Sequence, residues 1–146
     1  MSETNNIDKF DVLVGKILAR LYERFPIKCE LMPENFGIKD SVGELLSEPS
    51  SSAGDMKDLQ FLEATVGWLL ENEIITAKSS GFGSYYDARL TMKGLRLLKS
   101  APKSVDNERK SIGESLKELS KAGANESLKM AVNTLFSYGL SKFGLA

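Results

Sequence analysis

Few residues of this chain are suited to catalysis. With 0 His and 1 Cys in 146 residues, the remaining candidates are Asp, Glu, Lys, Ser and Tyr. Histidine general bases, Ser-His-Asp triads, disulfide frameworks and Cys/His zinc sites are therefore excluded within one chain. The segment Gly81-Phe82-Gly83 is not a phosphate loop, because no Gly-Lys-Ser/Thr follows it. We expect a protein that is not an enzyme and that holds no metal or cofactor.

The chemistry left to the chain is charge recognition. Lys and Arg total 19 and Asp and Glu total 20, so the formal net charge is -1 and only local clusters can attract a charged partner. Residues 55–73 contain five acidic residues and one basic residue, a net charge of −4. Residues 76–103 contain six basic residues and one acidic residue, a net charge of +5. The two adjoining segments are therefore opposite in sign.

The N-terminal third of the chain has the pattern of a helix followed by a strand. Apolar residues recur every three or four positions and predict an amphipathic helix that ends near Phe25, before Pro26. Alternation of apolar and charged residues over 27–31 predicts a short strand, with Cys29 buried and without a redox role. A second short helix is expected between Pro33 and Leu46, and the Ser-rich residues 47–54 are expected to form an exposed loop.

The middle of the chain predicts a helix, a hairpin and a further helix. Asp55 is placed to cap a helix from about 56 to 72, with Trp68 packed in the core. Two β-prone runs, 74–78 and 85–90, flank a Gly/Ser tip at which Phe82 is expected to be exposed. Thr91 is expected to cap the next helix. The predicted buried stripe of the helix over 56–72 is Leu59, Leu62, Val66 and Leu69.

The last part of the chain predicts an appended helical arm. Residues 103–110 are polar and charged, as in a linker, and Asn125 is placed to cap the second helix of the arm. The apolar face of that helix is broad and must be covered by something. A dimer or another protein partner and packing against its own chain both remain open, and a membrane surface ranks last. The expected partner contacts are Val132, Leu135, Phe136, Gly139, Leu140 and Phe143.

The order of these elements resembles the winged-helix variant of the helix-turn-helix fold. The segment Phe61 to Ile75 looks like a third helix running into a wing, and Leu90-Thr91-Met92-Lys93-Gly94 looks like the return strand and closing helix of bacterial winged-helix regulators. The resemblance implies that the third helix enters the DNA major groove and that the wing contacts the DNA beside it. The third helix departs from this pattern because its negative charge is repelled by phosphate.

Three interpretations of the charged segments remain open. They are solvated surfaces, or a nucleic-acid interface led by the wing and the closing helix, or a surface for another protein or a second copy. In the nucleic-acid interpretation, four bases contact phosphates and two aromatic residues contact sugar or base. These residues are Lys78, Arg89, Lys93 and Arg96, with Phe82 and Tyr85.

We therefore expect a mainly α fold with a small β-hairpin. A winged-helix domain covers 1–102, and a linker and amphipathic arm cover 103–146. No secretory signal or transmembrane segment is expected, which predicts a cytoplasmic location. The leading expectation for function is a regulator that binds double-stranded DNA. The alternative is a winged helix adapted for protein interaction or self-association.

Overall fold

The computed structural model of the chain describes residues 5–38, 49–81, 83–100 and 110–143, without the side chains of 49–56 and 138–143. The expected class, mainly α with a small β-hairpin, is confirmed, and the hairpin is extended to a three-stranded antiparallel sheet. The elements in chain order are α1 (Asn6–Arg24), β1 (Cys29–Leu31), the 3-10 helix η1 (Pro33–Phe36), α3 (Pro49–Glu71), β2 (Ile75–Gly81), β3 (Ser84–Leu90), α4 (Met92–Lys99), α5 (Ile112–Ala122) and α6 (Asn125–Phe143).

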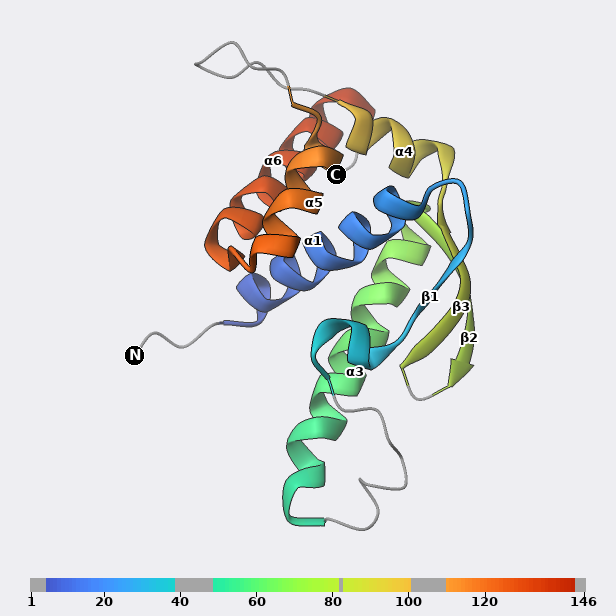
Figure 1. Cartoon of the computed structure of the whole chain (residues 1–146), viewed down its shortest axis with the longest axis vertical. Helices are drawn as coiled ribbons and strands as arrows, with labels where there is room; N and C mark the ends of the chain where they lie inside the picture. Colours follow the sequence, from blue (N-terminus) through green and yellow to red (C-terminus); the bar gives the residue numbers. More distant parts are fainter. Residues whose placement is uncertain (1–4, 39–48, 82, 101–109, 144–146) are drawn as a thin grey trace.

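Helix α1 lies at the centre of the fold, between the α5–α6 pair and the layer formed by α3 and the sheet (Figure 1). The side chain of Asn5 begins the helix by accepting a hydrogen bond from the backbone N of Asp8 at 2.8 Å. Val14, Ile17 and Leu18 are completely buried. Because residues on several sides of α1 are buried, this helix joins the part of the hydrophobic core at α5 and α6 to the part at α3 and the sheet.

Helix α3 has the expected buried stripe but begins earlier than expected. Leu62, Val66 and Leu69 are completely buried, as the spacing predicted. The prediction of a loop over 47–54 is wrong for 49–54, because α3 begins at Pro49 and Asp55 lies inside the helix. A proline fits the first helical turn, where its missing N–H has no intrahelical partner. The predicted second helix lies outside the described residues, apart from η1.

The sheet has strand order β1-β3-β2 with both pairings antiparallel. Ile75 pairs with Leu90, and Cys29 pairs with Ala88 on the other edge of β3. The hairpin tip is tighter than predicted, because both strands extend toward it and leave Gly81 and Gly83 at φ +93° and +79°. Glycine adopts this left-handed region without a Cβ clash.

Thr91 caps α4 as predicted and also ties α4 to the end of α3. Its Oγ1 accepts a hydrogen bond from the backbone N of Gly94 at 3.0 Å and donates to the carbonyl O of Glu73 at 2.6 Å. The backbone N of Thr91 donates to the carbonyl O of Ile74 at 3.1 Å. Gly94 packs so closely that a Cβ there would overlap this same carbonyl.

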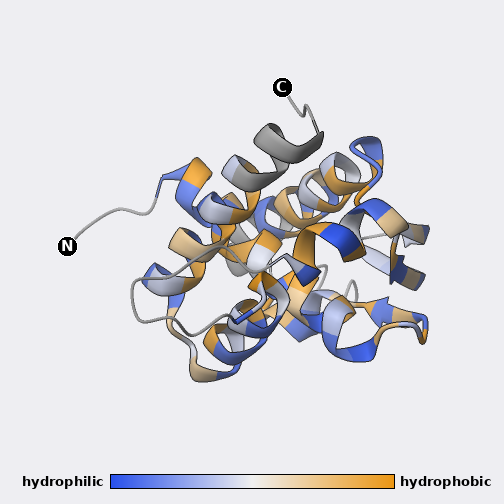
Figure 2. Cartoon of the chain, turned by 90° about the horizontal axis from the view of Figure 1, so that it is seen from above, coloured by the Kyte–Doolittle hydropathy of each residue, from blue (hydrophilic) through white to orange (hydrophobic). Residues whose placement is uncertain are grey.

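Helices α5 and α6 pack against their own chain. Their completely buried side chains include Leu116, Leu128 and Val132, which belong to the same core cluster as the buried residues of α1. A Cβ on Gly15 would lie 2.7 Å from Cγ of Leu128, so α1 and α6 approach closely at that point. Figure 2 shows that apolar residues gather toward the interior of the molecule, where its helices meet. The described residues of the arm therefore pack against their own chain, which is one of the two leading alternatives.

Candidate functional site

The outer face of the β2–β3 hairpin carries Lys78, Tyr86 and Arg89, all of them exposed. Lys78 pairs with Tyr86 across the two strands, and Thr76 pairs with Arg89. The Nζ of Lys78 lies 3.8 Å from the Oδ2 of Asp87 and 6.0 Å from the centre of the Tyr86 ring. Part of the positive charge expected at this surface is therefore balanced within the hairpin.

Tyr85 is not on this surface, contrary to the prediction. Its exposed fraction is 7%, and its hydroxyl donates to the carbonyl O of Glu63 at 3.5 Å. Burial, with a smaller contribution from the Glu63 carboxylate, raises the pKa of Tyr85.

The cause is a β-bulge at Asp87, which has φ 55° and lies where the pairing register shifts between Thr76 and Lys78. The extra residue puts Tyr85 on the inner face and leaves Tyr86 and Arg89 outside.

Lys93 is also not a free phosphate contact. Its side chain is half-buried, and Nζ donates to the carbonyl O of Asn72 at 3.0 Å, just beyond the C-terminus of α3. A cation at this position is favoured by the helix dipole. Arg96 and Lys99 are exposed on α4, whereas Phe82 lies outside the described residues.

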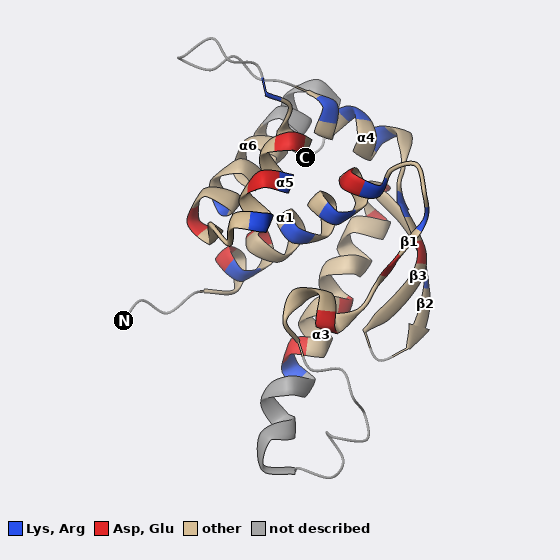
Figure 3. Cartoon of the chain, in the orientation of Figure 1, with Lys and Arg blue, Asp and Glu red and all other residues tan. Residues whose placement is uncertain are grey.

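The charge of the surface formed by α3 and the hairpin differs from that of α4. Between residues 57 and 89 there are three basic and five acidic residues, whereas α4 contains Lys93, Arg96 and Lys99 and no acid. Figure 3 shows these basic residues on α4. A duplex laid across α3 and the hairpin would therefore meet more acidic than basic residues.

The solvent-facing side of α3 is short of charge and of large side chains. Gln60 and Ala64 are exposed, and a Cβ on Gly67 would meet nothing within 4 Å. Lys57 and Glu71 lie on the same side, toward the two ends of the described part of the helix. We call these five residues, together with Trp68, the α3 face.

Trp68 joins the α3 face to a cluster of aromatic rings. Its ring centroid lies 5.2 Å from that of Phe10 and 5.6 Å from that of Phe136, so one residue comes from each of α3, α1 and α6. Edge-to-face contacts of this kind stabilise the packing between the three helices. The interpretation of Trp68 as a core residue is only partly right, because 38% of it is exposed.

The predicted partner contacts on α6 do not form an open surface. Val132 and Leu135 are buried at 0% and 1% exposure against the chain's own core, which corrects their assignment as partner contacts. Phe136 is half-buried in the aromatic cluster. The side chains of Gly139, Leu140 and Phe143 lie outside the described residues.

Metal-ligating groups do not cluster in the described part of the chain, where no three His, Cys, Asp or Glu side chains come together. Cys29 is buried and free, and burial raises the pKa of its thiol. None of the described helices combines the length and apolar character that a membrane crossing requires.

The fold and this surface define a mainly helical protein with a small antiparallel sheet and a lightly charged helix face. Comparison with known proteins finds no matching protein family, no matching curated protein and no matching solved structure.

Proposed function

We propose that the chain is a winged-helix protein of regulatory type that binds protein rather than catalysing a reaction, and that the α3 face associates with a second copy of the chain. The element order and the three-stranded sheet support the winged-helix assignment. The observation that carries the association is the symmetry of charge about Ala64. Lys57 precedes Ala64 by 7 residues, and Glu71 follows it by 7.

This spacing makes the α3 face self-complementary. If two α3 helices pair antiparallel about a two-fold axis at Ala64, Lys57 faces the partner's Glu71 and the reverse pair forms by symmetry. A small residue at the axis allows the close helix spacing of about 8 Å that tight packing needs. Trp68 supplies a large, partly exposed ring beside the axis.

Charge exchange tests this arrangement. We expect Lys57→Glu and Glu71→Lys each to weaken the dimer in sedimentation equilibrium by about tenfold at low salt, since two exposed pairs of up to about 1 kcal/mol each become repulsive. The double variant Lys57→Glu/Glu71→Lys restores both pairs and is expected to associate like the unmodified chain.

A second pair of variants distinguishes an effect at the α3 face from a general effect of added charge. Ala64→Arg places a long cation at the axis and is expected to abolish the dimer, whereas Ala122→Arg, at an exposed alanine of α5, leaves it intact. A monomeric unmodified chain at high concentration, or a double variant no better than either single one, contradicts the α3 dimer.

Binding of double-stranded DNA is a second candidate function. Two observations favour it: α4 carries three bases and no acid, and Arg89 is exposed on the outer face of the sheet. The surface differs from the one predicted, because Tyr85 is buried and Lys93 holds the end of α3. Arg89, Lys99 and Lys78 remain as phosphate contacts from the hairpin and α4.

The salt dependence of duplex binding tests this candidate. For Arg89→Ala/Lys99→Ala we expect weaker binding to mixed-sequence duplex and a log K against log salt slope that is smaller by about 0.9 for each lost contact. Lys121→Ala, at an exposed base of α5, serves as the control. Equal slopes for the double variant and the unmodified chain exclude this surface. The cytoplasmic location stays a prediction.

A further inference from the structure

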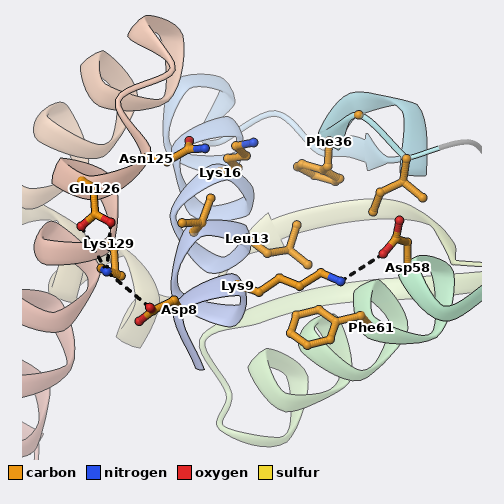
Figure 4. Close-up of a pocket in the computed structure, with 13 residues that line it drawn as sticks. Asp8, Lys9, Leu13, Lys16, Phe36, Asp58, Phe61, Asn125, Glu126 and Lys129 are labelled. Carbon is orange, nitrogen blue, oxygen red and sulfur yellow. Dashed lines mark hydrogen bonds and ion pairs between the residues drawn. The ribbon is translucent and has the colours of Figure 1, made fainter. Parts of the chain in front are cut away.

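A groove with two adjoining pockets runs along one side of α1. The larger pocket has a volume of about 520 Å³ and lies between α1, α3, η1 and the start of α6 (Figure 4). The smaller pocket has a volume of about 350 Å³ and lies between α1, η1 and α5. Lys16, Phe36 and Gly37 line both pockets, so the two pockets adjoin at these residues. A space of this size accommodates a small organic ligand.

The larger pocket is lined by apolar and by charged residues in similar number, and ion pairs balance most of the charges. Leu13, Phe36 and Phe61 supply apolar and aromatic surface (Figure 4). The Nζ of Lys9 lies 3.0 Å from the Oδ1 of Asp58. Lys129 likewise pairs with Asp8 at 3.5 Å and with Glu126 at 3.1 Å. This end of the groove suits the uncharged, planar part of a ligand.

Lys16 stands where the two pockets meet. Its side chain is half-buried, and among the described residues it makes no hydrogen bond or ion pair. Figure 4 shows Lys16 and Phe36 on the same side of the pocket. A half-buried ammonium group loses part of its hydration, and an anion in the groove would compensate for that loss.

The smaller pocket has an excess of positive charge. Its lining includes Lys16, Arg20, Lys117 and Lys121 but only one acid, Glu23. Lys121 is neutralised by Glu23 at 2.6 Å, and this hydrogen bond lowers the pKa of the Glu23 carboxyl. Lys117 lies 3.6 Å from the Oε2 of Glu114, a half-buried pair that balances part of its charge. Lys16 and Arg20 therefore contribute charge that no acid lining the pocket balances.

Two of the polar side chains here are held in place by the backbone. The guanidinium group of Arg20 is fixed by a hydrogen bond from Nε to the carbonyl O of Glu30 at 2.9 Å and by a side-chain hydrogen bond with Cys29, and its further N–H groups are donors for a ligand. Oδ1 of Asn35 accepts from the backbone N of Met32 at 2.8 Å, so Nδ2 is the donor left for the pocket. A ligand that uses these donors has less side-chain entropy to lose.

We propose that this groove binds a small molecule with a phosphate group on an aromatic body. The phosphate lies at Lys16, Arg20 and Lys117, and the aromatic body lies against Leu13 and Phe36, because the Nζ of Lys9 already covers the ring of Phe61 at 4.8 Å. Phosphate fits better than a single carboxylate because donors from three elements line this pocket, Lys16 and Arg20 of α1, Asn35 of η1 and Lys117 of α5, and a phosphate has three oxygens to accept from them. The site is independent of the α3 face and of the exposed surface of α4.

Calorimetric titration with four defined compounds tests both halves of the proposal. The probes are inorganic phosphate, phenyl phosphate, adenosine monophosphate and adenosine. We expect the two aromatic phosphates to bind at least tenfold more tightly than inorganic phosphate, because only they use the apolar end of the groove. Adenosine is expected to bind at least tenfold more weakly than its monophosphate.

Variants identify the site. Lys16→Met keeps the length of the side chain and removes its charge, so it is expected to weaken binding of both aromatic phosphates at least tenfold with an unchanged circular dichroism spectrum. Lys28→Met, at an exposed lysine that lines neither pocket, is expected to bind as the unmodified chain does. Phe36→Leu is expected to weaken the aromatic phosphates and to leave inorganic phosphate unchanged.

Three results overturn the proposal. The first is that none of the phosphates binds at millimolar concentration. The second is that inorganic phosphate binds as tightly as phenyl phosphate, which would show that the groove binds an ion and that the aromatic body adds no affinity. The third is that Lys16→Met binds the aromatic phosphates as tightly as the unmodified chain does.

Discussion

Gly94→Ala is expected to destabilise the chain by at least about 3 kcal/mol, the upper part of the range for overpacked sites. The added Cβ would overlap the carbonyl oxygen of Ile74, which is backbone and cannot rotate away. That carbonyl also accepts the hydrogen bond from the backbone N of Thr91, so moving it breaks the connection between α3, β3 and α4. Chemical denaturation with a helix-sensitive probe measures the loss.

Gly67→Ala provides a matched control in another helix. A Cβ on Gly67 would meet nothing within 4 Å, and Gly67 is not among the glycines with positive φ. Alanine there is expected to raise the stability by about 0.5 to 1 kcal/mol through helix propensity. If Gly94→Ala and Gly67→Ala changed stability alike, the close approach of α4 to Ile74 would be wrong.

Truncation after Lys110 is expected to abolish cooperative unfolding. It removes α5 and α6 and with them five buried aliphatic side chains, Ile112, Leu116, Leu128, Val132 and Leu135. Each such side chain stabilises a fold by about 1.5 to 3 kcal/mol, so the loss is comparable to the whole stability of about 5 to 15 kcal/mol of an ordinary domain. Thermal unfolding followed by calorimetry detects the missing transition.

The same truncation distinguishes packing within one chain from an arm that only associates. An arm used only for association would leave a folded, monomeric remainder. As a milder change in the full chain, Leu128→Ala is expected to cost about 2 to 5 kcal/mol, because Leu128 is completely buried against Gly15. A folded truncated chain together with a neutral Leu128→Ala would refute this packing.

The parts of the fold that could be predicted from the sequence are those decided by neighbours in the chain. The apolar spacing of α1 and the Thr91 cap of α4 depend on residues three or four positions apart, and both are confirmed. Pro49 shows the limit of this reasoning. Proline and serine suit a loop and also the first turn of a helix, so their composition did not separate the two.

The candidate site was harder to predict because it depends on tertiary contacts. A strict period of two places Tyr85 and Arg89 on one face, but the bulge at Asp87 shifts the phase between them. The residue type of Asp87 is a local signal of the bulge, because Asp and Asn adopt a positive φ more readily than most residues do. The hydrogen bond from Lys93 to the carbonyl O of Asn72 joins α4 to the residue that follows α3, and no local sequence pattern predicts it.

The central position of α1 also has a consequence for synthesis on the ribosome. Gly15 is synthesised well before its contact Leu128, which comes 113 residues later in the chain. At about 5 to 20 residues per second, these two residues leave the peptidyl-transferase centre on the order of 6 to 23 s apart. During that interval the side of α1 that α6 will cover has no native partner. The nascent chain therefore presents this apolar surface to whatever binds emerging polypeptides, and the native core closes only after α6 has left the exit tunnel.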